Sequence, residues 1–266
     1  MLSSFQSERN DRLAPSGAPH LSHSRVSRYL VCPEQYRLYY VENLRPKVPS
    51  ASLVFGQIMH QALACLFRKT GDPIKHFEDS WGLLRNLRLG YNDRESWAKL
   101  NASGPALLRK FIKEEQPKLS NIRAVEKPFT HSITNLDLPF VGIVDLDADL
   151  HGKSTLVDFK TSGSRYDEFE AQLSDQLSAY QLAVPDAEQL ALCVLVKTKE
   201  PKIEWHVTTR TGAQLTEYLI KAGYIAHDIA DGRFFKRPGK HCAWCDFQPI
   251  CLGQTQKANE TLVAIA

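Results

Sequence analysis

The chain has 266 residues, 43% of them hydrophobic, and a formal net charge of +3. That is enough apolar material for one generous domain or two small ones. No run of about 18 apolar residues is present, which excludes a helical membrane protein, and the N-terminal stretch lacks the apolar part of a secretory signal. Six cysteines are too few for a disulfide scaffold. We therefore expect a cytoplasmic protein in which clustered cysteines serve metal or catalytic chemistry.

The first part of the chain is predicted to be helical. Residues 1–20 are polar and contain proline and glycine, which predicts a disordered tail. A serine N-cap near residue 22 begins a helix that runs to Val31 and breaks at Cys32-Pro33. Apolar residues at helical spacing from 53 to 67 predict the next helix, which contains His60.

A longer helical block is predicted from residue 73 to 116. Glycine and proline weaken or end helices, so Gly90 and the pair Gly104-Pro105 are expected to interrupt this block. The pattern then changes to short runs rich in Val, Ile, Leu and Phe. These runs and the periodic segments after them predict strands at 122–133, 138–150 and 154–162, a helix at about 168–184, strands at 190–198 and 202–209, and a helix at 212–230.

This order predicts an α/β fold with one mixed central sheet flanked by helices, in which the helix after the third strand acts as a crossover. A single domain is expected over residues 21–254. It would comprise a helical part to residue 120, a sheet core to residue 210 and a last part with a cysteine triplet. Residues 255–266 would form a tail.

The stretches "GIVDLD" and "LVDFKTS" bring three polar side chains together. Because side chains alternate along a strand, Asp158 and Lys160 point to one face while Phe159 is buried behind them. A hairpin turn near Gly152 would place Asp145 roughly opposite Asp158.

Two aspartates and a backbone carbonyl, that of Phe159, would suit Mg²⁺ or Mn²⁺, which prefer oxygen ligands. Lys160 would then orient a water or offset transition-state charge. The alternative is a solvated hairpin with exposed ion pairs, since short Asp and Lys patterns are common there.

Two other elements contribute polar residues. His60 would be a metal ligand or a packed core histidine. Gln176 and Tyr180 are spaced by four and share one helix face that could reach the site, although Tyr180 could equally be a core residue.

The C-terminal stretch "KHCAWCDFQPIC" carries Cys242, Cys245 and Cys251. From spacing alone, a C-x2-C pair favours tetrahedral Zn²⁺. The basic and aromatic segment before it suits phosphates and bases, or is a solvated loop with two anchoring aromatics. Its candidate DNA-binding residues are Arg233, Phe234, Phe235, Lys236, Arg237 and Lys240.

Six stretches occur in the order seen in a known nuclease family. They are "LSHSRVSRYLVCPEQYRLYYV", "FGQIMHQAL", "GIVDLD", "LVDFKTS", "DQLSAYQLA" and "CAWCDFQPIC". On these stretches, the chain resembles the RecB-like nucleases of the PD-(D/E)XK superfamily. It is especially similar to the iron-sulfur members, which include the AddB nuclease domain and the CRISPR-associated adaptation nuclease.

The resemblance implies catalytic roles for the polar residues. Glu126 would match an acidic position of the first strand, and Asp158 stands where many members carry Glu, within the allowed pattern. The implied motifs are His60 in the metal shell, Asp145 as the motif II aspartate, Asp158 and Lys160 as the (D/E)XK pair, and Gln176 and Tyr180 as the QxxxY motif.

The resemblance also implies that Cys32 is the fourth ligand beside Cys242, Cys245 and Cys251, and it favours a [4Fe-4S] cluster over zinc. The cluster would tie distant parts of the chain together, so metal binding would contribute to folding. Cys65 and Cys193 are expected to be buried small hydrophobes.

The expected activity is that of a metal-dependent deoxyribonuclease. Its preference for single strands and its exonuclease action come from the resemblance, as do roles in repair, recombination, phage or CRISPR DNA processing. The alternative is a non-catalytic DNA-binding or scaffold module that works with a helicase or integrase. No phosphate-binding G-x-x-x-x-G-K-[ST] motif is present, so unwinding would need a partner.

Overall fold

The structure is a computed structural model that describes residues 20–132 and 138–265. It divides into two compact units. Unit 1 comprises Met1–Pro49, Thr130–Val141 and Thr216–Ala266, and unit 2 comprises Ser50–Phe129 and Gly142–Leu215. The predicted tail at residues 1–20 lies outside the described residues except for its last position. Among residues 20–132 and 138–265, no helix is both long and apolar enough to cross a membrane.

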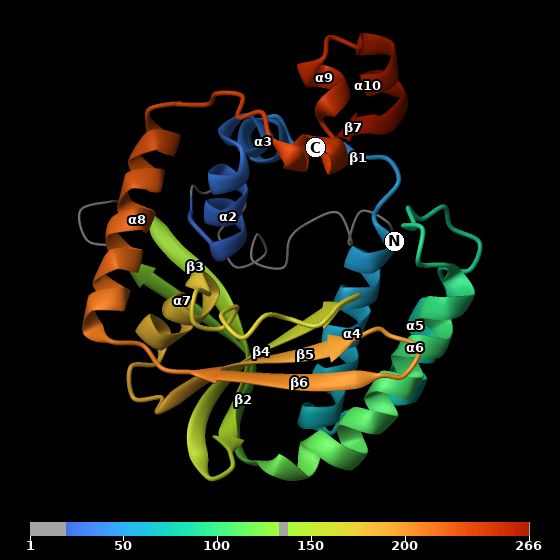
Figure 1. Cartoon of the computed structure of the whole chain (residues 1–266), viewed down its shortest axis with the longest axis vertical. Helices are drawn as coiled ribbons and strands as arrows, with labels where there is room; N and C mark the ends of the chain where they lie inside the picture. Colours follow the sequence, from blue (N-terminus) through green and yellow to red (C-terminus); the bar gives the residue numbers. More distant parts are fainter. Residues whose placement is uncertain (1–19, 133–137, 266) are drawn as a thin grey trace. The chain divides into compact units, whose positions relative to one another are not determined.

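Unit 2 is built on a five-stranded sheet in the order β2-β3-β4-β5-β6 (Figure 1). The pair β4 and β5 is parallel and is connected through α7, whereas β3 with β4 and β5 with β6 are antiparallel. The mixed sheet and its crossover helix therefore confirm the predicted fold class. The strands are β2 (Leu119–Ser132), β3 (Pro139–Leu150), β4 (Lys153–Ser162), β5 (Gln189–Val196) and β6 (Lys202–Thr208), and α7 is Asp175–Ala183.

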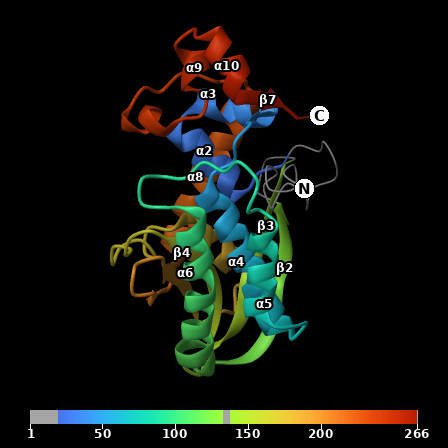
Figure 2. The same ribbon diagram turned by 90° about the vertical axis from the view of Figure 1, so that its right-hand side faces the viewer.

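Three helices of unit 2, α4, α5 and α6, lie side by side in both views (Figures 1 and 2). The first of them contacts β4 and the last contacts β6. Their amphipathic spacing explains this packing, because one face of each is apolar. Their bounds are Ala51–Arg68 for α4, Pro73–Gly82 for α5 and Trp97–Lys110 for α6.

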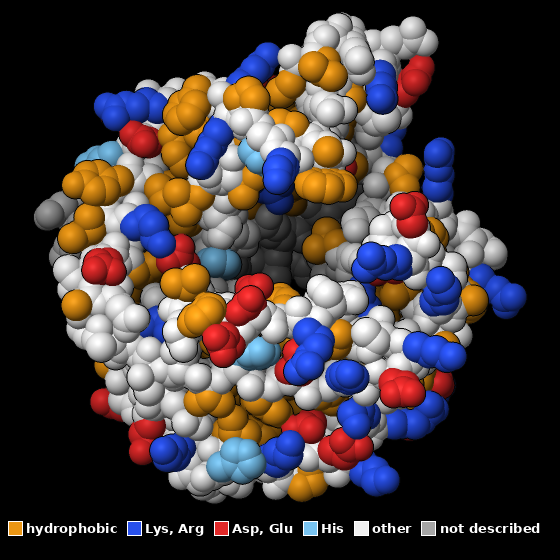
Figure 3. Space-filling model, viewed as in Figure 1, with side chains coloured by type: hydrophobic (Ala, Val, Ile, Leu, Met, Phe, Trp, Pro, Cys, Tyr) orange, Lys and Arg blue, Asp and Glu red, His pale blue; other side chains and the backbone are white. Residues whose placement is uncertain are grey.

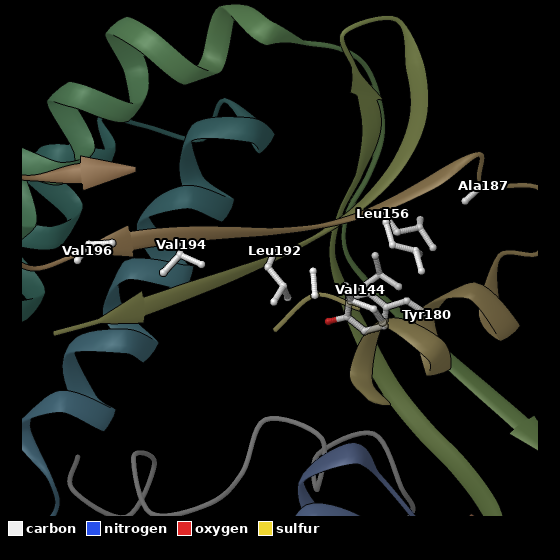
Figure 4. Packing of buried hydrophobic residues seen from close by; sticks show 10 residues of the cluster. Val144, Leu156, Tyr180, Ala187, Leu192, Val194 and Val196 are labelled. Atoms are coloured by element: carbon white, nitrogen blue, oxygen red, sulfur yellow. The ribbon is translucent and has the colours of Figure 1, made fainter. Parts of the chain in front are cut away.

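The sheet of unit 2 is covered on both faces by apolar side chains. On one face, α7 packs Leu177 and Tyr180 against residues of β3, β4 and β5 (Figure 4). On the other, Phe159 stacks on Phe67 of α4 at 6.1 Å and meets Phe111 edge-on at 5.8 Å. Burial on both faces makes β5 a nearly continuous apolar strand, as expected for a parallel pair, whereas β4 also carries the polar Asp158 and Lys160.

Two helix predictions for unit 2 were wrong. Gly104-Pro105 does not interrupt the helix, because α6 runs through both residues. Gly104 is instead required for packing, since a Cβ there would lie 2.1 Å from Cζ of Phe77. The crossover helix does not begin near residue 168 but at Asp175, where the Ser174 side chain accepts the N–H of Leu177 as an N-cap.

Unit 1 combines helices from both ends of the chain. Its first helix begins after Ser22, whose side chain accepts the Arg25 N–H, as predicted. Residues 255–264, assigned to a tail from sequence, form a helix and a strand that pairs with β1. The elements are α2 (His23–Val31), α3 (Pro33–Tyr36), a π-helical turn (Arg37–Val41), β1 (Leu44–Pro46), most of α8 (Gly212–Ala230), a 3-10 turn (Lys240–Trp244), α9 (Gln248–Cys251), α10 (Thr255–Thr261) and β7 (Leu262–Ala264).

Candidate active site

The candidate site of unit 2 begins where β3 and β4 separate. Their regular pairing ends at Leu146 and Val157, one position before Asp145 and Asp158. Beyond that point the Phe159 amide donates to Oδ2 of Asp145 at 2.9 Å. A carboxylate thus takes the place of a neighbouring strand's carbonyl, and the two aspartates lie together as the sequence predicts.

Asp158 and Lys160 form a close ion pair on one face of β4. The Lys160 ammonium lies 2.7 Å from Oδ2 of Asp158, whose side chain is 1% exposed, while the lysine side chain is 33% exposed. Lys160 also donates to Oε1 of Gln176 at 2.6 Å. The lysine therefore reaches solvent with its ammonium held on two sides.

Tyr180 of α7 joins the two strands at the point of separation. Its hydroxyl lies 2.7 Å from the Ile143 carbonyl oxygen and 3.0 Å from Oδ1 of Asp158, and its single proton can be donated to either. Nε2 of Gln176 donates to the same hydroxyl at 3.2 Å. The two residues spaced by four do share one face, and that face meets the site.

Gly142 of β3 supports this arrangement by leaving room for an aromatic ring. A Cβ at position 142 would lie 2.3 Å from Cζ of Phe129. The Phe129 ring packs edge-on against Tyr180 at 6.1 Å. The glycine of the "GIVDLD" stretch thus helps to hold the tyrosine in place.

His60 of α4 reaches the same carboxylates. Its Nδ1 lies 3.3 Å from Oδ2 of Asp145. One helical turn earlier, a Cβ at Gly56 would come within 3.2 Å of Oγ1 of Thr161, so α4 approaches β4 closely here. His60 is therefore part of the polar cluster and not a buried core histidine.

Burial and charge act together on the titratable groups. Burial raises the pKa of Asp158, the Lys160 ammonium opposes that rise, and the Asp145 carboxylate adds to it. Burial alone would lower the pKa of Lys160, but the Asp158 carboxylate outweighs it and the pKa is raised. Two adjacent carboxylates with one ammonium leave an excess of negative charge in a water-poor site.

A divalent cation would offset that excess, and the donor set suits one. Asp145 and Asp158 offer carboxylate oxygens, and Oδ2 of Asp158 already faces the Lys160 ammonium at 2.7 Å. Mg²⁺ and Mn²⁺ prefer such oxygen ligands. Within residues 20–132 and 138–265, no group of three or more His, Cys, Asp or Glu side chains is arranged as a ready metal site. The oxygen donors fit, and further ligands would come from His60, the backbone or water.

The site contains a residue that sequence reasoning missed. Tyr166, half-buried in the loop after β4, lies close enough to Lys160 and Asp158 for their charges to act on it, and burial raises its pKa. No periodic pattern marks a tyrosine in a loop. The acidic residue noted in β2, Glu126, has a left-handed backbone (φ 51°) and pairs with Arg68 of α4 at 3.0 Å.

Unit 1 holds the four cysteines singled out from sequence. Nε2 of Gln35 donates to Sγ of Cys245 at 3.5 Å, and the Gly239 amide donates to Sγ of Cys242 at 3.5 Å. Burial raises the pKa of Cys245 and of Cys251, and the neighbouring Cys32 raises both further. Cys32, Cys245 and Cys251 are thus close enough to interact.

The basic segment of unit 1 is partly engaged with its own chain. Phe234 stacks on Tyr36 at 5.9 Å, whereas Phe235 is 57% exposed. Trp244, which lies between Cys242 and Cys245, is 81% exposed. The segment's cations make these contacts: Arg233 with Asp228 and Asp231 at 2.8 Å each, Lys236 with the Cys251 carbonyl at 3.2 Å, and Arg237 with the Leu30 carbonyl. Lys240 is exposed.

Comparison with known proteins gives one family and one informative fold. The sequence model described as the PD-(D/E)XK nuclease superfamily matches residues 20–252. The crystal structure of a candidate exonuclease from Eubacterium rectale is similar in fold, with a TM-score of 0.54 and 12% identity, covering 85% of this chain and 87% of that one. The structure of a protein called SSO0001 covers 94% of this chain and 93% of its own at 13% identity, but its TM-score of 0.45 carries no argument. No curated protein sequence matches.

Proposed function

The chain belongs to the PD-(D/E)XK nuclease superfamily, and from that premise we propose that it hydrolyses DNA phosphodiester bonds at the cluster of Asp145, Asp158 and Lys160. The observation that carries the proposal is the ion pair of Lys160 with Asp158, 2.7 Å long and next to Asp145. In an ion pair on a solvated hairpin the carboxylate would be exposed, whereas the Asp158 side chain is only 1% exposed. The buried carboxylate therefore favours chemistry over a solvated strand face.

In the proposed site, Asp145, Asp158, His60 and the Phe159 carbonyl would hold Mg²⁺ or Mn²⁺. When bound, such a cation supplies positive charge that polarises the phosphate and activates water. Lys160 would orient the attacking water or offset charge that develops on the phosphate, and a preorganised ammonium does this without reorganisation.

Gln176 and Tyr180 would act as positioning residues in this site. Gln176 accepts a hydrogen bond from the Lys160 ammonium at 2.6 Å. The Tyr180 hydroxyl lies within hydrogen-bond distance of both Asp158 and the Ile143 carbonyl. Their hydrogen bonds would fix the rotamers of Lys160, which would face the phosphate, and of Asp158, which would hold the cation.

The proposed substrate is single-stranded DNA, degraded from an end. The support is the resemblance of the motifs and the fold shared with a candidate exonuclease. Repair, recombination, and phage or CRISPR DNA processing are the pathways in which such an enzyme would act, with a helicase or an integration protein as partner. The exposed Phe235, the predicted basic segment around it and Trp244 would add binding surface in unit 1.

The test compares wild type with Asp158→Asn on end-labelled single-stranded and double-stranded oligonucleotides, with Mg²⁺, Mn²⁺ or EDTA. We expect metal-dependent shortening from one end of the single strand by wild type only. Binding without cleavage by wild type in every metal would contradict the proposal and support the non-catalytic module. Equal cleavage by both proteins would place the chemistry elsewhere.

We also propose that Cys32, Cys242, Cys245 and Cys251 bind a [4Fe-4S] cluster, as in the iron-sulfur and AddB-like members of the family. All six cysteines are free, so none of these four is engaged in a disulfide. Two of the four sulfurs already accept N–H donors, and such donors tune sulfur ligands. Anaerobic purification followed by iron, sulfide and zinc analysis tests this assignment. Zinc without iron would refute the cluster and leave the nuclease proposal intact.

A further inference from the structure

A groove of about 1080 Å³ lies within unit 2, outside the polar cluster described above. One wall is the first three turns of α6, where Lys99, Ala102, Ser103 and Ala106 follow the spacing of one helix face. Two alanines and a serine have short side chains, so this face of α6 leaves the groove open. The opposite wall is formed by residues 163–164 and 197–201.

The groove begins close to the catalytic strand. Gly163 and Ser164 follow directly on the last residue of β4, the strand that carries Asp158 and Lys160. At about 3.3 Å per residue, Gly163 is roughly 10 Å along the chain from Lys160. A polymer strand with its phosphate at the lysine would reach the groove within two nucleotides or so.

Among the charged residues that line the groove, cations outnumber carboxylates. Arg94, Lys99 and Lys199 are exposed, and neither Arg94 nor Lys199 is in an ion pair with a described residue. The lining carboxylates are Asp93 and Glu95. Figure 3 shows Lys and Arg side chains gathered over the region where Figure 1 places α5 and α6. Lys99 donates to the Arg94 carbonyl at 3.1 Å, which leaves its charge unpaired among the described residues, and exposed cations at the rim suit phosphate groups.

A buried network fixes the floor of the groove. The Lys197 ammonium donates to Oε1 of Glu95 at 2.9 Å and to Oγ of Ser52 at 3.2 Å, and it lies 5.0 Å from the ring centroid of Phe55. The Ser52 hydroxyl donates to Glu95 at 2.6 Å. This network ties the loop before α6 to the N-terminal turn of α4 and to the end of β5. The rim cations thus stand on a rigid support.

We propose that this groove binds the sugar-phosphate backbone of the DNA strand next to the scissile phosphate, with Arg94, Lys99 and Lys199 as the phosphate contacts. The inference rests on the proposed nuclease function and adds its specificity site. A cavity of this size is just above the range for small-molecule pockets, about 300–1,000 Å³. It therefore takes a few nucleotides of one strand and not a duplex.

The test measures binding of fluorescein-labelled dT12 in EDTA by fluorescence anisotropy at several salt concentrations. The variant is Lys99→Glu with Lys199→Glu. The matched control is Lys113→Glu with Lys153→Glu, two exposed lysines outside the groove, one of them at the opposite end of β4. We expect the groove variant to bind about 10- to 100-fold more weakly and to lose about 1.4 from the salt slope, since each single-strand phosphate contact contributes about 0.7.

A second measurement separates this proposal from the nuclease proposal. It measures hydrolysis, with Mn²⁺ present, of the p-nitrophenyl ester of thymidine 5′-monophosphate. This substrate is too short to reach the groove. We expect the groove variant to hydrolyse it within about twofold of wild type, while its kcat/KM on dT12 falls in proportion to the loss of binding.

Each outcome decides between the two proposals. Equal dT12 affinity and salt slope in the groove and control variants would overturn the groove assignment. That result is also expected if the groove binds an acidic protein and not DNA. Absence of dT12 binding by wild type would also overturn it. If wild type hydrolyses neither substrate, the nuclease proposal fails while the binding comparison still tests the groove.

Discussion

The two polar clusters of this protein differ in what holds them together. In unit 2, carboxylates, ammonium, amide and hydroxyl contact one another at 2.6–3.3 Å, so the chain itself completes the cluster. In unit 1, the described contacts of the cysteine sulfurs are long, at 3.5–4.0 Å, and come from an amide, a carbonyl and a side chain. The first arrangement suits the catalytic role proposed for it, whereas the second suits the proposed structural role completed by a metal.

The largest effect would come from breaking the cysteine cluster. Cys245→Ser should abolish binding of the proposed metal, and unit 1 should then no longer unfold cooperatively. The reason is that structural metal sites contribute about 10 kcal/mol to folding. Metal analysis and hydrogen exchange measure both effects. The control is Cys65→Ser, in α4 of unit 2, which should keep the metal. Unchanged metal content in Cys245→Ser would refute its role as a ligand.

The next largest effect would come from a carboxylate of unit 2. Asp145→Asn should lower the cleavage rate by about 1,000-fold, the size of loss seen when a charge-stabilising group leaves an active site. Its melting temperature should stay close to that of wild type, since the amide can still accept the Phe159 N–H. Asp149→Asn on the same strand is the matched control. Equal rates in the two variants would remove Asp145 from the site.

Tyr180→Phe should have a smaller effect of mixed kind. It leaves Oδ1 of Asp158 and the Ile143 carbonyl without the hydroxyl, at a cost of about 1–3 kcal/mol in unfolding free energy. We expect kcat to fall about tenfold with little change in KM, because the carboxylate loses its position and the substrate keeps its contacts. Urea unfolding and kinetics measure these changes. Tyr224→Phe, whose side chain is 71% exposed, should change neither quantity.

Glu95→Gln should give the smallest effect, and it depends on pH. Burial alone would raise the pKa of Glu95, but hydrogen bonds from Lys197 and Ser52 outweigh it, so the pKa lies below its ordinary value of 4.5. A lowered folded pKa stabilises the protein above pH 4.5, and this contribution is lost as pH falls through the folded value. At pH 7 the free energy of unfolding of wild type should exceed that of Glu95→Gln by about 1 kcal/mol. A difference that does not shrink below pH 4.5 would contradict this.

Local periodicity made much of the site in unit 2 predictable. Asp158 and Lys160 share a face because strand side chains alternate, and Gln176 and Tyr180 share one because helix residues spaced by four do. The hairpin placed Asp145 near Asp158 for the same local reason. These geometric predictions agree with the contacts, while the catalytic and metal-binding roles stay proposals.

Features that depend on tertiary packing could not be read from local patterns. Gly104 looked like a helix break because its contact with Phe77 comes from another helix. Tyr166 lies in a loop, where no period indicates direction. The division into two units arises from segments that are distant in sequence, so composition could not reveal it. The separation of β3 from β4 is likewise set by side chains of α4 and α7 and not by the strands alone.

The central claim is that the phosphodiester bond is cleaved at the ion pair of β4 in unit 2. Single-turnover cleavage of end-labelled single-stranded DNA by Lys160→Met, with Lys153→Met from the same strand as control, tests it most directly. The account predicts a loss of about 1,000-fold in Lys160→Met, while the control cleaves at the wild-type rate. A folded Lys160→Met protein that cleaves as fast as the control would contradict the claim.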